Sequence, residues 1–292
     1  MTPTRTDLAR RAVTKAAEVR DRFDIPLNAA VNVFDLCTEH IAPAITVRFK
    51  DISMEGMYLR EERPEIWIGL RPLTRRVFNC AHELGHHVFG HGSTFDELQA
   101  DGAAERPFNP DEFVVNTFAA HLLMPRLAVA SAFTTRGWKA EEATPEQCFI
   151  VSCSFGVGYE TLANHLVYGL QVVGRSRSDA LLKTRLPTIR KGLLEHDTPD
   201  RLTVIDHHHT LPTVDIEVGT GLLLPANTEV ENQELAAGHD TVRGRLFQIA
   251  RSGVTRAYSP DGNWAILIRA MPHQYVGLAR YRHLAREDGE DD

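Results

Sequence analysis

The sequence predicts an α+β protein in which helices and a small sheet come first, a helical region follows, and a β-rich part ends the chain. Three observations lead to this order. Apolar residues recur at helical spacing near the N-terminus and again over residues 112–124. Short runs between residues 45 and 70 have the composition and alternation of strands. After Pro199, β-branched runs separated by turn residues favour further strands.

The composition is typical of a soluble globular protein. Of the 292 residues, 43% are hydrophobic and 24% are charged, and the formal net charge is −7. This acidic balance argues against general coating of nucleic acid, which needs a strong basic surplus, but it leaves a local basic patch open. Residues 1–11 lack the apolar core of a signal peptide, and no apolar run of about 18 residues suggests a membrane span. The four cysteines form no C-x-x-C pair and are typical of reduced thiols, so we expect a cytoplasmic protein.

The N-terminal part predicts two helices followed by three strands. The first helix, over about residues 6–24, follows from its apolar spacing, and a second over about 30–39 is ended by Pro43. The predicted strands are residues 45–49, 57–60 and 65–70, of which the last alternates with a two-residue period. These elements lead directly into the segment that carries the chemistry.

The segment Phe78–Phe89 contains no proline and suits a helix, and it includes His82-Glu83-Leu84-Gly85-His86. Residues four apart lie on one helix face, so His82 and His86 can hold one metal ion between them. Glu83 follows the first histidine, where a carboxylate can reach a water molecule on that metal. This is the H-E-x-x-H pattern of zinc peptidases, and it predicts a zincin-like metallopeptidase domain over residues 1–130.

The residues alone leave the third metal ligand open. A catalytic zinc takes three protein ligands and keeps a fourth position for water. His91 is one residue too close for the three-histidine form H-E-x-x-H-x-x-G-x-x-H, so we expect it not to be a ligand. Glu112 opens the next apolar helix and is one candidate. The other candidates lie in the acidic stretch 93–111, which we expect to be a solvated loop: Asp96, Glu97, Asp101, Glu105 and Asp111.

Two segments of the chain together resemble the ImmA/IrrE family of metallopeptidases. That family is marked by H-E-[LI]-[GS]-H and then E-x-x-x-N-x-F-A-A-x-L-L-M-P, and residues 82–86 and 112–125 match both patterns in order. The resemblance covers roughly residues 6–130. It implies that Glu112 is the third ligand and that Asn116, one helical turn later, lies near the site. Cys80 and Val115 depart from the usual family residues, and neither is an expected ligand.

The resemblance implies a zinc-dependent endopeptidase. The metal would lower the pKa of a bound water, and Glu83 would take its proton as general base and later pass it to the leaving amine. We expect Zn²⁺ as cofactor, although Mn²⁺ or Fe²⁺ suits the same two-histidine, one-glutamate ligands. Members of the family act on helix-turn-helix repressors. The implied partner is therefore a transcriptional repressor whose cleavage derepresses genes of a stress response or a mobile element.

Residues 131–198 predict a helical, helix-turn-helix-like region that ends in a basic linker. A helix over 146–154, a glycine turn at 155–158 and a helix over 159–168 follow one another. The basic stretch 175–191 reads as a linker or a solvated helix face more readily than as a nucleic-acid patch. DNA binding is therefore left open but not favoured, because most short helical hairpins bind no DNA.

Residues 199–285 predict a β-rich, sensor-like domain, and residues 286–292 a disordered acidic tail. The turn Ser259-Pro260-Asp261-Gly262-Asn263 predicts a hairpin between residues 254–258 and 264–269. A longer member of the resembled family similarly joins a peptidase domain to a helix-turn-helix-like domain and a β-rich domain.

A second hypothesis is a non-enzymatic, DNA-binding regulator whose zincin domain is structural. The helical hairpin and the basic stretch after it support this reading. Glu83 and the net charge of −7 argue against it, because a structural zinc site needs no glutamate beside its histidine. The sequence carries no signal for the oligomeric state.

Overall fold

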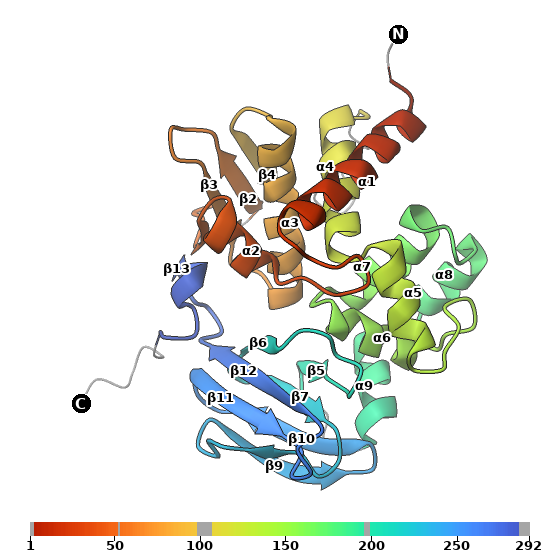
Figure 1. Cartoon of the computed structure of the whole chain (residues 1–292), viewed down its shortest axis with the longest axis vertical. Coiled ribbons are helices and arrows are strands. Elements are labelled where there is room, and N and C mark those ends of the chain that lie inside the picture. The colour runs from red at the N-terminus through yellow and green to blue at the C-terminus, as the bar shows by residue number, and fades with distance from the viewer. Residues whose placement is uncertain (1–2, 52, 98–106, 196–198, 286–292) are drawn as a thin grey trace. The chain divides into compact units, whose positions relative to one another are not determined.

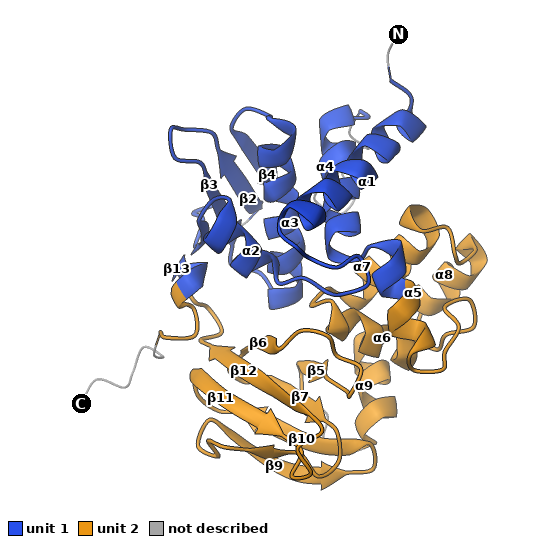
Figure 2. Ribbon diagram, viewed as in Figure 1, with its two compact units in different colours: residues 1–129, 276–280 blue, residues 130–275, 281–292 orange. Residues whose placement is uncertain are grey.

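A computed structural model describes residues 3–51, 53–97, 107–195 and 199–285. These residues form helices and small sheets, which confirms the mixed α and β class (Figure 1). The chain divides into two compact units (Figure 2): residues 1–129 with 276–280, and residues 130–275 with 281–292. The helical region and the strands after residue 199 fall in one unit, and the domain boundaries drawn from the sequence stay a prediction. The predicted tail over 286–292 lies outside the described residues, as do Asp101 and Glu105.

The first unit contains a five-stranded sheet. Its strands are β1 (Ala44–Val47), β2 (Met54–Leu59), β3 (Glu65–Gly69), β4 (Thr94–Glu97) and β13 (Gly277–Leu278). Their order is β13-β1-β3-β2-β4, in which β1 and β3 are parallel and the other neighbours are antiparallel. Its helices include α1 (Arg5–Arg22), α2 (Val33–His40), α3 (Leu73–Phe89) and α4 (Pro110–Leu123). Among the described strands, β4 therefore lies at one edge of the sheet.

Helix α1 is joined to α4 by a buried arginine. The helix begins with a capping box between Thr4 and Asp7. Apolar residues from Leu8 to Val19 form its buried face, and Arg20 is buried next to them. The Arg20 guanidinium donates hydrogen bonds to the backbone carbonyls of Leu122, Pro26 and Ala29. Leu122 belongs to the last turn of α4, where backbone carbonyls lack helical partners. Arg20 therefore provides hydrogen-bond donors for backbone carbonyls both at the end of α4 and in the loop after α1.

Helices α3 and α4 approach closely because Gly85 has no side chain. A Cβ atom at Gly85 would lie 3.0 Å from Cβ of Val115 and 3.2 Å from the ring of Phe118. Helix α3 then ends at Gly90, whose φ of 72° is the left-handed conformation that glycine adopts readily. The close approach faces the histidines of α3 toward the first turns of α4.

Residues 94–97 form strand β4, so the expectation of a loop over 93–111 is wrong at this point. Strand β4 pairs antiparallel with β2, with Tyr58 opposite Thr94 and Gly56 opposite Asp96. The register shifts between Met54 and Gly56, which is a β-bulge. Four residues with two carboxylates give too short an alternation to signal a strand, and pairing with β2 decides the outcome instead.

The second unit begins with helices. It contains most of α5 (Arg126–Thr134), then α6 (Pro145–Ser154), α7 (Tyr159–Asn164), a π-helical turn over His165–Gly169, α8 (Arg175–Leu182) and α9 (Leu186–Leu194). A capping box between Thr144 and Gln147 starts α6. Helix, glycine turn and helix follow one another as the sequence predicts. DNA binding by these helices, which the sequence leaves open but does not favour, is not tested by the fold.

Two four-stranded sheets complete the second unit. One has the order β5-β7-β10-β9 and the other β6-β12-β11-β8. The strands are β5 (Leu202–Val204), β6 (Thr213–Glu217), β7 (Gly221–Leu224), β8 (Glu229–Val230), β9 (Ala236–Thr241), β10 (Gly244–Ile249), β11 (Gly253–Tyr258) and β12 (Ala265–Met271). Their inward side chains share one apolar core that includes Leu222, Phe247 and Ile268. Strands β11 and β12 pair as the predicted hairpin.

One segment among the described residues is long and apolar enough to cross a membrane by composition. It covers Pro110–Thr134, and 56% of its most apolar window is buried within the protein. The segment consists of α4 and α5, and α4 packs against α1 and α3. Burial inside a folded unit is the behaviour of a core helix, so this segment gives no support for a membrane span.

Candidate metal centre

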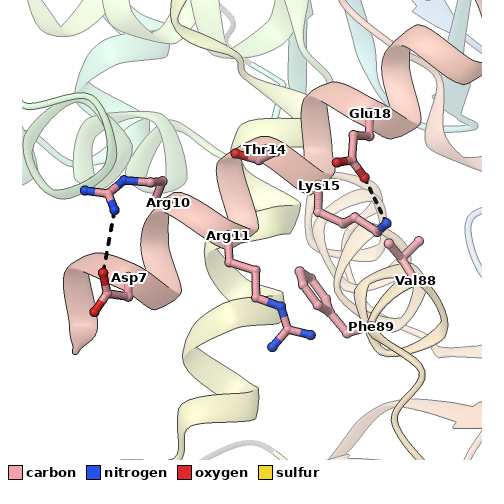
Figure 3. A pocket seen from close by; sticks show the side chains of 8 residues that line it. All are labelled: Asp7, Arg10, Arg11, Thr14, Lys15, Glu18, Val88 and Phe89. Carbon is pink, nitrogen blue, oxygen red and sulfur yellow. Dashed lines mark hydrogen bonds and ion pairs between the residues drawn. The ribbon is translucent and has the colours of Figure 1, made fainter. Parts of the chain in front are cut away.

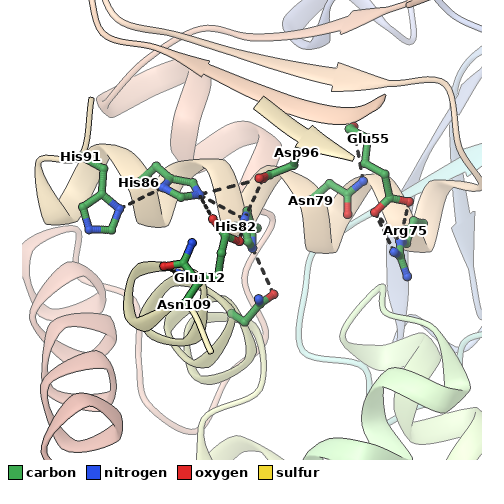
Figure 4. Close-up of polar contacts among 10 residues, drawn as sticks. Glu55, Arg75, Asn79, His82, His86, His91, Asp96, Asn109 and Glu112 are labelled. Atoms are coloured by element: carbon green, nitrogen blue, oxygen red, sulfur yellow. Dashed lines mark hydrogen bonds and ion pairs between the residues drawn. The ribbon is translucent and has the colours of Figure 1, made fainter. Parts of the chain in front are cut away.

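Four side chains from three elements converge in the first unit. His82 and His86 come from α3, Asp96 from β4 and Glu112 from α4, and each offers one donor atom within 4.8 Å of the others. Figure 4 shows the two imidazoles and the two carboxylates turned toward one another. Of the acidic candidates that the structure describes, Asp96 and Glu112 belong to this group, and Glu97 and Asp111 do not.

The distances place the donor atoms around a common point. The Nε2 atoms of His82 and His86 are 3.2 Å apart. Glu112 places Oε2 at 3.4 Å from Nε2 of His82 and Oε1 at 3.6 Å from Nε2 of His86. Asp96 places Oδ2 at 2.7 Å from Nε2 of His82. Both histidines are buried, with 8% and 1% of their surface exposed.

Glu112 is positioned by the start of its helix. The Asn109 side chain accepts hydrogen bonds from the backbone N–H groups of Asp111, at 3.0 Å, and Glu112, at 3.5 Å. Pro110 occupies the first turn, where its missing N–H costs nothing. Asn109 is therefore the N-cap of α4. This cap directs the first turn of α4 toward α3.

Partners on the far side of each ring orient the two histidines. Nδ1 of His82 is 3.1 Å from Oδ1 of Asn116, which can only accept. Nδ1 of His86 is 2.9 Å from Nδ1 of His91, whose Nε2 is 3.5 Å from Oδ1 of Asp111. A proton on each outward Nδ1 leaves both Nε2 lone pairs facing the common point. His91 is thus outside the donor group, in agreement with its spacing, and orients His86.

Glu83 lies in the wall of the same cavity. Its side chain is fully buried, and neither carboxylate oxygen has a hydrogen-bond partner among the described residues. Burial raises the pKa of Glu83 well above its usual range, and the neighbouring Asp96 carboxylate raises it further. A buried carboxylate without partners is costly, so such groups usually serve chemistry rather than stability.

The site attracts positive charge. Burial alone would lower the pKa of His82, but the Asp96 and Glu112 carboxylates raise it to about 10. Burial and the charge on His82 lower the pKa of His86 to about 4. Burial would raise the pKa of Asp96, yet His82 holds it at about 2. The two carboxylates therefore favour a positive charge beside them, and the lowered pKa of His86 shows that His82 and His86 are not both protonated there.

These residues fit a zinc ion. Two imidazole nitrogens and carboxylate oxygens are ligands that zinc prefers, and the donors meet from different elements at one point. The unpartnered Glu83 side chain lines the same cleft as His82, Asp96 and Glu112, as expected for a group that acts on a bound water. Imidazole and carboxylate ligands also bind Mn²⁺ and Fe²⁺, so the donor set alone does not select zinc over these ions.

The donor group opens into a cleft of about 710 Å³. Its lining comes from α3, β4, the bulge of β2 and the start of α4: Glu55, Arg75, Phe78, Asn79, His82, Glu83, Phe95, Asp96, Glu97, Pro107, Asn109, Glu112 and Asn116. Arg75 is paired with Glu55 at 2.6 Å, and the ring of Phe95 is 64% exposed. The cleft has both apolar and charged walls.

A second cavity in the first unit has a different character. It measures about 500 Å³ and lies between α1 and the end of α3 (Figure 3). Its charged side chains pair with each other: Asp7 with Arg10 at 3.6 Å, and Lys15 with Glu18 at 2.8 Å. Such pairs along one helix are typical of a solvated face, so this cavity is not the functional site.

Asn116→Ala is expected to lower zinc affinity by roughly 10–100-fold, because the hydrogen bond that orients His82 is lost. Competition with a coloured chelator measures the affinity. Thr117→Val is the matched control, since the Thr117 hydroxyl bonds the Phe113 carbonyl within its own helix. Equal affinities for Asn116→Ala and Thr117→Val would show that Asn116 does not support the metal.

Comparison with known proteins agrees with this geometry. Residues 39–167 match the family model described as the IrrE N-terminal-like domain, Peptidase_M78. The matched range contains all four donor residues and Glu83. No curated protein matches the chain.

Proposed function

We propose, from the membership of residues 39–167 in the ImmA/IrrE family of metallopeptidases, that the chain is a site-specific zinc-dependent endopeptidase. Its proposed substrate is a helix-turn-helix transcriptional repressor. The observation that carries the peptidase activity is a buried, unpartnered Glu83 beside a converging group of two histidines and two carboxylates. A metal site that serves structure alone has no use for such a glutamate.

His82, His86 and Glu112 would hold the ion. Bound there, zinc supplies Lewis-acid chemistry, by which it polarises the scissile carbonyl and makes a water molecule acidic enough to attack. Asn116 and His91 keep the two imidazoles in the tautomer that leaves Nε2 free. These three ligands come from α3 and α4, which can approach closely because Gly85 has no side chain.

Glu83 moves the proton. Its raised pKa makes it a competent acceptor for a proton from the attacking water and a competent donor to the leaving amine. The carboxylate is buried and lies against Gly56 of β2, so little reorganisation is needed before the reaction. Cleavage then needs the scissile bond to lie along the cleft between β4 and the start of α4.

Strand β4 offers a way to hold an extended peptide there. It is the last strand of the sheet among those described, and it lines the cleft through Phe95 and Asp96. A substrate segment can add to this edge by backbone hydrogen bonds, while pockets beside it select side chains. The exposed Phe95 ring suits an apolar substrate side chain.

The choice of a repressor as substrate rests on the family resemblance. Cutting a helix-turn-helix repressor removes it from its operator and derepresses its genes, in a stress response or in the control of a mobile element. Such a substrate is found in the cytoplasm, which is also the location proposed for this chain. The helical and β-rich second unit is proposed to sense the signal that starts cleavage.

The proposal is tested with the helix-turn-helix repressor encoded beside the gene for this chain. The purified protein with one equivalent of Zn²⁺ is expected to cut it at one position. Removing the metal with a chelator is expected to lower the rate by roughly 10²–10³-fold, because several kcal/mol of transition-state stabilisation are lost. Adding Zn²⁺ back restores the rate.

Two outcomes would contradict the proposal. Cleavage that continues after the metal is removed would exclude the zinc mechanism. An intact repressor in the presence of zinc-loaded protein, together with salt-dependent binding of the chain to operator DNA, would favour the non-enzymatic regulator. Fragments separated by electrophoresis and mass spectrometry provide the readout.

A further inference from the structure

The candidate centre contains one more carboxylate than a catalytic zinc site needs. Oδ2 of Asp96 lies 2.7 Å from Nε2 of His82 and 3.9 Å from Nε2 of His86. The corresponding distances for the Glu112 oxygens are 3.4 Å and 3.6 Å. Asp96 is therefore as well placed for the ion as the glutamate that the family pattern implies.

Asp96 is held in place by the sheet. It stands opposite Gly56 beside the β-bulge of β2, and its Oδ2 atom is buried against His82. Its neighbours Phe95 and Glu97 are exposed, because successive residues of a strand point to opposite faces. The strand thus presents the Asp96 carboxylate to the histidines, whereas the Glu97 side chain is exposed and lies outside the donor group.

We propose that Asp96 is a fourth metal ligand that closes the centre in the resting protein and withdraws when substrate enters. This inference rests on the proposed function, since it concerns the same zinc site. Two imidazoles and two carboxylates complete a tetrahedral zinc, and a closed tetrahedral site has no position for water. Their two negative charges also neutralise Zn²⁺, which lowers the cost of burying it.

The position of Asp96 on an edge strand gives the withdrawal a physical route. Strand β4 has four residues and is held by pairing with β2. A substrate segment that adds to the outer edge of β4 engages the strand that carries Asp96. Substrate binding and opening of the metal centre then involve the same backbone. This arrangement keeps water from the metal until a fitting segment is bound.

Metal binding tests the proposal without proteolysis. Zinc affinity is measured by chelator competition for the full chain and for Asp96→Asn and Asp96→Ala, and Glu97→Gln is the control that removes the same charge from the next residue. Both Asp96 variants are expected to bind zinc at least about tenfold more weakly, since a directly bound group matters no less than a group that orients a ligand. Glu97→Gln is expected to bind like the wild type.

Access to the open position is measured with cobalt-loaded protein. Azide, a small anion, is expected to change the visible spectrum of the Asp96 variants at a concentration at least about tenfold lower than for the wild type, because a fourth position has become free. Circular dichroism of the metal-free proteins verifies that each variant is folded, and Asp96→Asn keeps the shape of the side chain.

The outcomes separate this inference from the proposed function. If the zinc affinity or the azide response of the Asp96 variants equals that of Glu97→Gln, Asp96 is not a ligand, whatever the enzyme cleaves. If the wild type binds no zinc at all, the proposed function itself fails.

Discussion

Glu83→Gln is expected to lower the rate of repressor cleavage by about 10²–10⁴-fold, the usual contribution of a general base. The amide keeps the size of the carboxylate but cannot accept the proton of the attacking water. Zinc affinity should change by no more than a few-fold, because Glu83 is not one of the four converging donors. The variant thus separates metal binding from proton transfer.

Folding should not suffer from this change. Burial already disfavours the charged form of Glu83, and the Asp96 carboxylate disfavours it further. A neutral amide removes this repulsion, so we expect the metal-free variant to unfold at the same temperature as the wild type or a higher one. Glu39→Gln, at a side chain that is 59% exposed, makes the same chemical change away from the cleft. Wild-type cleavage rates for Glu83→Gln would overturn the assigned role.

Local signals in the sequence predict most of the first unit. Helix α3 is predicted because the H-E-x-x-H segment is free of proline and is followed by Gly90, which ends it in the left-handed conformation. At the start of α4, Asn109 is the cap and Pro110 occupies the first turn, which are both local signals. Each of these signals is contained within a few residues of chain, which is the range over which sequence patterns decide structure.

The composition of the metal centre is less predictable, because its donors meet across the fold. Glu112 is implied by resemblance and not by spacing from His86. Asp96 sits in a stretch whose acidity predicts a solvated loop, and its inward direction depends on a register with Gly56 that no local pattern encodes. The role of His91 also depends on distance, since its ring meets His86 only after Gly90 has turned the chain.

The second unit shows the same division. The hairpin of β11 and β12 is predicted from its turn, and the two strands pair as expected. The sequence predicts no individual strands at the positions of β7 to β10. In β9 (Ala236–Thr241), for example, a glycine and polar residues interrupt the alternation. Their place in the sheets comes from pairing between distant segments, for example β5 with β7.

Gly56 is the residue of the site that the sequence signals least, and Gly56→Ala is expected to lower cleavage by about 10²-fold. A Cβ atom at Gly56 would lie 2.2 Å from Oε1 of Glu83 and 3.0 Å from its Cδ atom. Ordinary contact requires more than 3.4 Å, so Glu83 must shift by about 1 Å, a displacement that can cost two orders of magnitude in rate. Zinc affinity should stay close to that of the wild type.

Gly92→Ala is the matched control, because a Cβ atom there meets nothing within 4 Å. The decisive comparison is the double variant Gly56→Ala with Glu83→Gln. If the added methyl group acts by displacing the base, it has nothing left to displace once Glu83 is an amide, and the double variant should be no slower than Glu83→Gln alone. If the two losses multiply instead, Gly56 supports cleavage through the sheet or the cleft and not through Glu83. A four-way comparison of rates therefore tests whether the backbone of β2 is what holds the general base in place.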